Sequence, residues 1–330
     1  MPRRRKALVP ALVAALVLAG PACGARSLAG DWGPLPGMLV SIGSHELHIH
    51  CTGEGAPAVV FESGLGGTSL DWVSVQPAVS GFTRACSYDR AGYGWSESGP
   101  HPRHAVRIAA ELDRLLVYAS VPPPWVLVGH SFGGLTMRAF AARFEPEAVA
   151  GMVLVDATHE DQFQRMAAAG IPVPMAPTGR KFVIANHWAV PNGLPPALKP
   201  LAQRFALVPR AIGTLYSELG TMRYSALQVT SMRWATDAPV TVLARGPRRG
   251  AVSSRTARLD RMWLDLQRDL ATSVNDGSLQ VVPDSGHYIH LDHPERVVTA
   301  IRTIVEASRL DRQSDAAPPP GRFGSARQEE

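Results

Sequence analysis

Apolar and polar positions along the chain follow two periods, one typical of buried strands and the other of amphipathic helices. Short apolar runs rich in β-branched residues, such as 57–62 and 125–129, predict strands that are buried on both faces. Longer stretches with an apolar residue at every third or fourth position predict helices, most clearly over 105–119. Strands that alternate with helices in this order indicate an α/β protein, a mostly parallel sheet with helices on both faces.

The predicted elements extend over residues 38–308. A hairpin opens this region, a terminal amphipathic helix closes it, and strands and helices alternate between them. Strands are predicted at 38–42, 45–51, 57–64, 83–92, 125–129, 149–158, 238–246 and 278–287, and helices at 69–80, 105–119, from 135 onward, and at 294–310.

Residues 158–237 interrupt this alternation. They contain many prolines, apolar residues and short helical patches, but no convincing strand pattern. Linkers are not this rich in Met, Phe, Trp and Leu, so the segment predicts a helical lid inserted between two parts of a core, 38–157 and 238–308. The polar, proline-rich end, 309–330, predicts a disordered tail.

Composition agrees with a large folded domain. The chain has 330 residues, of which 45% are hydrophobic, enough for a substantial core. Four of the positive charges lie at residues 3–6, within a segment, 1–25, that contains no acid. Without them the formal net charge falls from +5 to +1, which argues against a basic surface for nucleic acid.

The same N-terminal segment is typical of an export signal. A basic start is followed by the apolar run Ala7–Ala19 and then by small residues, with Ala22 or Ala25 as the expected cleavage position. The alternative is an uncleaved membrane anchor, although the run is short for a span and contains Pro10. A lipid-modified Cys23 is a further alternative. We therefore expect a secreted or extracytoplasmic protein whose only membrane association would be through residues 1–25.

Two cysteines, Cys51 and Cys86, lie outside this segment. An even pair in an exported protein suggests a disulfide bond. Each cysteine falls on or next to a predicted strand, so the bond requires that these two strands be neighbours.

The segment "GHSFGG", residues 129–134, joins a predicted buried strand to a predicted helix. A G-x-S-x-G turn at such a junction holds the serine hydroxyl out above the sheet edge, and its glycines allow close backbone approach. The helix N-terminus also favours developing negative charge. Ser131 is therefore a candidate nucleophile, the alternative being an ordinary tight turn with a surface serine.

The segment "VVPDSGHYIHLDHPE" supplies a candidate base. His287 follows the last predicted strand and precedes the last helix, so it projects from a loop at the carboxyl edge of the sheet. The neighbouring His290 and His293 lack that placement.

Together, "GHSFGG", "SYDRAGYGWSE" and "SGHYIHLDHPE" resemble the α/β-hydrolase family of serine hydrolases, over about residues 38–308. The resemblance implies the α/β-hydrolase fold, an eight-stranded sheet with one antiparallel strand near the start and a lid after the sixth strand. In that fold the second strand lies beside the fourth, which would permit the disulfide between Cys51 and Cys86. The loop that contains Asp89 and Arg90 is mainly structural in this family.

The chain departs from the commonest family pattern in its acidic residue. Most members carry this acid after the seventh strand, but residues 238–259 contain no Asp or Glu. Some members carry it after the sixth strand, where this chain has Asp156. We assign Asp156 as the acid. Asp260 and Asp284 remain alternatives for the acid. If either of them has that role, Asp156 would be a structural residue that caps the following turn.

The resemblance assigns a role to each residue. His287 would take the proton of Ser131 during attack and return it to the leaving group, while Asp156 would orient the histidine. The backbone N–H groups of Phe132 and of Leu65, in "ESGLGG", would form the oxyanion hole.

These assignments predict an exported serine hydrolase that acts on a carboxylic ester or related acyl substrate, without cofactor or metal. Family members that open epoxides or remove halogen use an aspartate nucleophile, so Ser131 disfavours both activities. A prolyl-iminopeptidase-like aminopeptidase would need acidic lid residues, and a non-catalytic binding protein on this scaffold is the remaining alternative. The acidic residues available to hold an amine are Glu160, Asp161, Glu218 and Asp237, and Trp188 is a candidate for the lid's lining.

Overall fold

The computed structural model describes residues 34–143, 148–171, 190–232, 237–250 and 253–316. The chain divides into two units, Met1–Pro34 and Leu35–Glu330, and all the strands and helices named below belong to the second. The predicted signal segment 1–25 and Trp188 lie outside the described residues. Within the described residues, no helix combines the length and the apolar character needed to cross a membrane.

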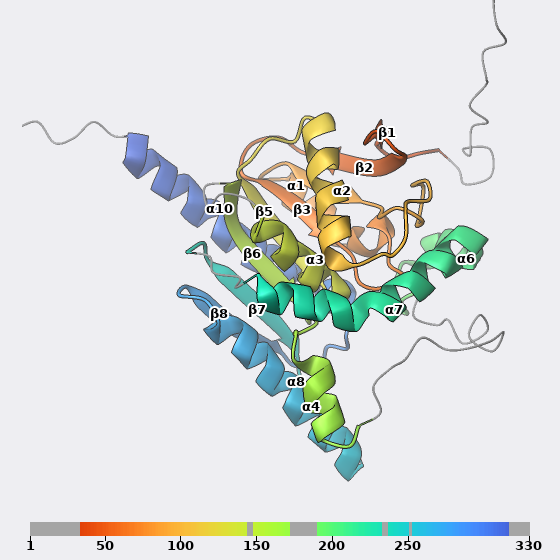
Figure 1. The fold of residues 1–330 in the computed structure, drawn as a ribbon. Helices are drawn as coiled ribbons and strands as arrows, with labels where there is room; N and C mark the ends of the chain where they lie inside the picture. The colour runs from red at the N-terminus through yellow and green to blue at the C-terminus, as the bar shows by residue number, and fades with distance from the viewer. Residues whose placement is uncertain (1–33, 144–147, 172–189, 233–236, 251–252, 317–330) are drawn as a thin grey trace, which may run out of the picture. The chain divides into compact units, whose positions relative to one another are not determined.

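An eight-stranded sheet forms the centre of the fold, in the order β1-β2-β4-β3-β5-β6-β7-β8 (Figure 1). Only β2 runs against its neighbours, and the five pairs from β4 to β8 are parallel. The prediction of a mostly parallel sheet with one antiparallel strand near the start is therefore confirmed. The strands are β1 (Met38–Ser41), β2 (Glu46–Thr52), β3 (Ala58–Glu62), β4 (Ala85–Tyr88), β5 (Trp125–His130), β6 (Val149–Val155), β7 (Val240–Arg245) and β8 (Gly277–Val282).

The disulfide joins β2 to β4. Cys51 and Cys86 are directly opposite one another in the antiparallel register of these strands and are bonded. The predicted pairing is confirmed.

Helices cover both faces of the sheet because successive strand residues point to opposite sides. On β5, Leu127 contributes to the apolar layer under α2 (Ala105–Tyr118) and α3 (Phe132–Ala141). Its neighbours Val126 and Val128 contribute to the layer under α1 (Gln76–Ser80) and α10 (Pro294–Ala316). A further helix, α8 (Ser254–Thr272), packs on β7 and β8.

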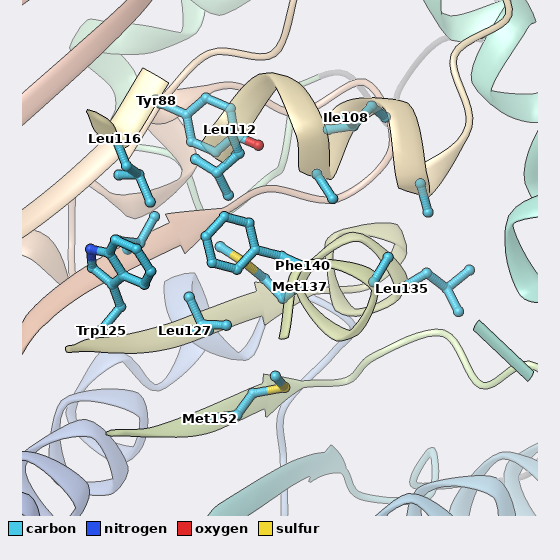
Figure 2. Close-up of a cluster of buried hydrophobic side chains, with 14 of the residues drawn as sticks. Tyr88, Ile108, Leu112, Leu116, Trp125, Leu127, Leu135, Met137, Phe140 and Met152 are labelled. Atoms are coloured by element: carbon cyan, nitrogen blue, oxygen red, sulfur yellow. The ribbon is translucent and has the colours of Figure 1, made fainter. Parts of the chain in front are cut away.

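The layer beneath α2 and α3 is close-packed (Figure 2). Leu112 and Leu116 of α2 face Phe140 of α3 and Trp125 of β5, and the rings of Trp125 and Phe140 meet edge to face with centroids 5.5 Å apart. This apolar contact fixes α3, and with it the junction at which β5 passes into that helix.

Helices occupy the insertion between β6 and β7. They are α4 (Gln162–Ala168), η5 (Pro196–Leu198), α6 (Lys199–Leu207) and α7 (Pro209–Ser231). The long helix α7 packs against α3 and α2, and α4 packs against α8. The described part of 158–237 contains no strand, as the sequence predicts.

The C-terminal helix is longer than predicted. Helix α10 continues to Ala316, so the first residues of the predicted disordered tail are helical, and residues 317–330 lie outside the described residues. Within the predicted part of the helix, Nε of Arg309 donates to the carbonyl of Ala56 and its Nη2 to that of Phe82. Arg309 thus ties α10 to the segments that precede β3 and β4.

Candidate active site

Ser131 occupies a sharp turn between β5 and α3. Its φ of 51° and ψ of −121° lie in a region that residues other than glycine rarely adopt. Backbone hydrogen bonds hold the turn: Ser131 donates to Val155, and its carbonyl accepts from Gly134 and Thr158. Strain maintained in this way is typical of a functional residue.

The glycines around Ser131 are required by close packing. A Cβ on Gly129 would lie 2.8 Å from the carbonyl oxygen of Gly133, and one on Gly133 would lie 2.6 Å from that of Glu62. A Cβ on Gly134 would lie 2.5 Å from the Cβ of Ala157. The start of α3 can therefore approach the ends of β3 and β6 only because these positions lack side chains.

His287 bridges Ser131 and Asp156. Its Nε2 lies 3.0 Å from Oγ of Ser131, and its Nδ1 lies 2.6 Å from Oδ2 of Asp156. The His287 carbonyl accepts a hydrogen bond from Nε2 of His130, 3.0 Å away, which fixes the loop after β8. The structure thus brings together the three side chains that the sequence singled out from three separate strand ends.

Asp156 is fully buried, at the end of β6, with a φ of 43°. Its second oxygen, Oδ1, accepts hydrogen bonds from the indole N–H of Trp263, at 2.6 Å, and from the backbone N–H of Arg245, at 3.1 Å. Nε of Arg245 also lies 3.5 Å from Oδ2. These contacts compensate the burial of the carboxylate and leave Oδ2 directed at His287.

The two alternative acids have other partners. Asp260, on α8, accepts hydrogen bonds from the side chains of Arg245 and Arg248. The half-exposed Asp284 forms an ion pair with Arg249. Arg245, the last residue of β7, contacts Asp156.

The loop after β3 lies against Ser131. A Cβ on Gly64 would lie 3.1 Å from the Cβ of Ser131, so Leu65 begins directly beside the candidate nucleophile. The hydroxyl of Ser63, where the family usually has histidine, donates to the carbonyl of Thr68 and accepts from Trp72, so it acts within the loop. Among the described residues, the N–H groups of Leu65 and Phe132 donate to no other backbone group.

A cavity of about 630 Å³ opens at Ser131 and His287. Its described lining is largely apolar, and residues of the insertion contribute to it alongside the core. The apolar lining residues are Leu65, Phe163, Leu219, Met222 and Trp263. Such a cavity favours a largely apolar ligand held by a few polar groups, which here include Arg245 and Arg248.

Two further histidines lie beside His287 but are uncharged. His130 and His290 are buried, and their ring centroids are 4.4 Å apart. Burial lowers the pKa of both imidazoles, with a smaller contribution from the other histidines, and the pKa of His290 falls to about 3. They add no positive charge to the surroundings of His287.

Asp71 is the one acidic side chain among the described residues that line the cavity. Burial, and to a lesser extent the charge of Asp89, raise its pKa to about 7 although Arg90 opposes the shift. Tyr288 also lines the cavity, and burial, with a smaller contribution from the charge of Asp71, raises the pKa of its hydroxyl.

The sequence did not point to several of these residues. Trp263 on α8 and Arg245 on β7 hold Asp156. They are far from Asp156 in the sequence and reach it only in the folded structure. Asp89 accepts hydrogen bonds from His48 on β2, from Ser69 after β3 and from Trp95 in its own loop, in agreement with the structural role that the family implies.

Comparison with known proteins identifies the family. The model of the alpha/beta hydrolase family matches residues 59–300, so the chain belongs to this family. The probable transporter efuK of Hormonema carpetanum is 26% identical over 309 residues, which cover 81% of this chain and 42% of that protein. The 2-hydroxy-6-oxo-2,4-heptadienoate hydrolase of Pseudomonas putida is 35% identical over 134 residues, which cover 37% of this chain and 44% of that protein. The chain thus spans less than half the length of the curated relatives it matches.

Solved structures share the fold at low sequence identity. A thermophilic esterase from Thermogutta terrifontis superposes with a TM-score of 0.60 and 21% identity, covering 82% of this chain and 98% of that one. An enol-lactonase from Burkholderia xenovorans superposes with a TM-score of 0.60 and 17% identity, covering 82% of this chain and 100% of that one. The α/β-hydrolase fold expected from the sequence is therefore confirmed.

Proposed function

We propose that this protein is a serine hydrolase that cleaves carboxylic esters through Ser131, His287 and Asp156. The observation that carries the proposal is the continuous chain of contacts from Oγ of Ser131 through the imidazole of His287 to Oδ2 of Asp156. This chain lies at the wall of an apolar cavity, where an acyl group can be held next to the serine.

Each residue has a defined task in the proposed reaction. His287 takes the Ser131 proton at Nε2 as Oγ attacks the carbonyl carbon, and Asp156 stabilises the imidazolium and fixes its tautomer. The N–H groups of Leu65 and Phe132 stabilise the negative oxygen of the tetrahedral intermediate. His287 then protonates the leaving alkoxide, and the same steps with water as nucleophile release the acid from the acyl-enzyme.

The chemistry of the cavity favours an ester over the alternatives. Epoxide and haloalkane hydrolysis in this family use an aspartate at the position of Ser131. An aminopeptidase would hold a substrate ammonium with carboxylates, but none of the four acidic residues of the insertion lines the cavity. Glu160 and Glu218 are engaged by Arg138 and Arg90. The remaining candidate, Asp71, is a weak partner for an ammonium because its pKa of about 7 leaves much of it protonated.

Export is part of the proposal. The basic and apolar segment 1–25 supports it, and so does the disulfide, because such bonds persist mainly in oxidising compartments. N-terminal sequencing of protein recovered outside the cytoplasm should find a start near residue 23 or 26, whereas a chain retained with residues 1–25 in the membrane would support an anchor.

The test of the activity is hydrolysis of p-nitrophenyl esters from acetyl to palmitoyl by the protein without residues 1–25. Turnover should be lost in Ser131→Ala. The acyl chain length that is hydrolysed fastest would indicate the size of the cavity. Parallel assays with aminoacyl p-nitroanilides address the aminopeptidase alternative. A folded protein without ester turnover would refute the proposal.

A further inference from the structure

Arg90 is a buried cation that takes no part in the proposed proton transfers. It follows β4, and its guanidinium makes five hydrogen bonds to four residues. Two acceptors are the carboxylates of Glu62, at the end of β3, and Glu218, on α7. The other two are backbone carbonyls of the loop after β3, those of Ser63 and Gly64, each 2.7 Å away.

The contact with Gly64 bears directly on the oxyanion hole. The carbonyl of Gly64 and the N–H of Leu65 belong to the same peptide group, which is planar and trans, so the two bonds point in opposite directions. When Nη2 of Arg90 holds the carbonyl, it fixes the direction in which the Leu65 N–H points. A cation on the carbonyl also polarises the peptide group and strengthens the N–H as a donor.

Glu218 holds Arg90 from the opposite side. Its Oε1 accepts from Nε of Arg90 at 2.8 Å, and its Oε2 accepts from Nη2 at 3.3 Å and from the hydroxyl of Tyr93 at 2.9 Å. The Glu218 side chain is fully buried, and its helix α7 also supplies Leu219 to the cavity. A helix of the insertion is therefore connected to the loop beside Ser131 through the guanidinium of Arg90, in addition to the packing of Leu65 against the apolar cluster that contains Leu215 and Leu219.

We propose that Arg90 and Glu218 are positioning residues, through which α7 fixes the peptide between Gly64 and Leu65 and aims the Leu65 N–H at the oxyanion. The insertion then completes the oxyanion hole as well as enclosing the substrate. This inference rests on the proposed ester hydrolysis for its kinetic test, but the orientation of the peptide can be measured without any activity.

The chain offers a matched control for the loss of a buried ion pair. Arg103 donates twice to Glu111, at 2.6 Å each, and both side chains are buried. Neither residue lines the cavity or contacts the loop after β3 through a described hydrogen bond. Glu111→Gln therefore removes a comparable charged contact and should leave the Leu65 peptide in place.

The kinetic test compares Glu218→Gln with Glu111→Gln on the best ester. Loss of one oxyanion donor typically costs about 10²–10³ in rate, and a misdirected donor should cost part of that. We expect kcat to fall about 10- to 100-fold in Glu218→Gln with KM changed less than about threefold, because the apolar cavity is intact. Glu111→Gln should keep kcat within about twofold. Tyr93→Phe, which removes one contact of Glu218, provides a milder variant should Glu218→Gln fold poorly.

The second measurement is the amide NMR resonance of Leu65 in protein labelled with ¹⁵N-leucine, assigned with Leu65→Ile. It should shift or broaden in Glu218→Gln and Tyr93→Phe but not in Glu111→Gln. An unchanged Leu65 resonance in both variants, or a loss of activity shared equally by Glu111→Gln, would overturn the inference. If the wild type shows no ester turnover but the Leu65 resonance is altered in Glu218→Gln and not in Glu111→Gln, the proposed function is refuted and the positioning role is supported.

Discussion

Trp263 and Asp156 are joined by a hydrogen bond of 2.6 Å between the indole Nε1 and the carboxylate Oδ1. The bond spans α8 and the end of β6, and it fixes the carboxylate so that its other oxygen meets His287. The position of the candidate acid therefore depends on a helix that contributes no residue to the triad itself.

Trp263→Phe should weaken both stability and catalysis. A hydrogen bond to a charged group contributes about 1.5–3 kcal/mol to the free energy of unfolding, and its loss frees the carboxylate to turn away from His287. We expect kcat to fall about tenfold. Trp125→Phe is the control, since the Trp125 indole donates to the Val121 carbonyl in the core beneath α2. Equal kcat in the two variants, measured on the same ester, would contradict the role of Trp263.

Asp156→Asn tests the choice of acid. The amide keeps the shape of the carboxylate but cannot stabilise the imidazolium, and such a change typically lowers kcat by about 10⁴. Asp260→Asn should lose less than about tenfold, because Asp260 contacts Arg245 and Arg248 and not His287. Steady-state kinetics of both variants decide between them, and the reverse order of effects would transfer the role to Asp260.

Asp71 should make stability depend on pH. Its pKa rises from 3.8 to about 7 on folding, so the folded state holds this proton more tightly than the unfolded state. The stability that comes from the protonated carboxyl of Asp71 is therefore fully present below about pH 4. It is lost as pH rises through 7, which lowers the free energy of unfolding by on the order of 4 kcal/mol.

Asp71→Asn removes this titration. The stability of the variant relative to the wild type should increase steadily between pH 4 and 8, as measured by urea denaturation at several pH values. A constant difference across that range would show that the pKa of Asp71 is not raised.

The disulfide should contribute substantially to stability. Cys51 and Cys86 are 35 residues apart. Closing a loop of this length lowers the entropy of the unfolded chain, which raises the free energy of unfolding by about 3–4 kcal/mol. The double variant Cys51→Ala, Cys86→Ala should therefore unfold at lower urea concentration and be insensitive to reductant. If dithiothreitol leaves the unfolding of the wild type unchanged, the bond does not contribute in this way.

The sequence predicted the features that depend on local pattern. Ser131 lies in a strand–turn–helix signature, and His287 lies between the last strand and the last helix, so each could be found from its neighbours in the chain. Asp156 could be selected only because the region after β7 lacks an acid. The structure explains that lack, since the backbone and side chain of Arg245 serve to hold Asp156.

The interactions that support the site could not be predicted in this way. Arg90 and Glu218 are 128 residues apart, and Trp263 and Asp156 are 107 residues apart. Nothing in the local pattern of either member indicates its partner, because the pairing depends on how α7 and α8 pack against the sheet.

The most direct test of the central claim is covalent labelling of the folded protein with a fluorophosphonate, followed by intact mass measurement and peptide mapping. The account predicts one adduct, on Ser131, formed rapidly in the wild type, slowly in His287→Ala and Asp156→Asn, and absent in Ser131→Ala. Labelling at another residue, or no labelling of a protein whose fold is intact, would contradict the assignment of Ser131 as the nucleophile of a serine hydrolase.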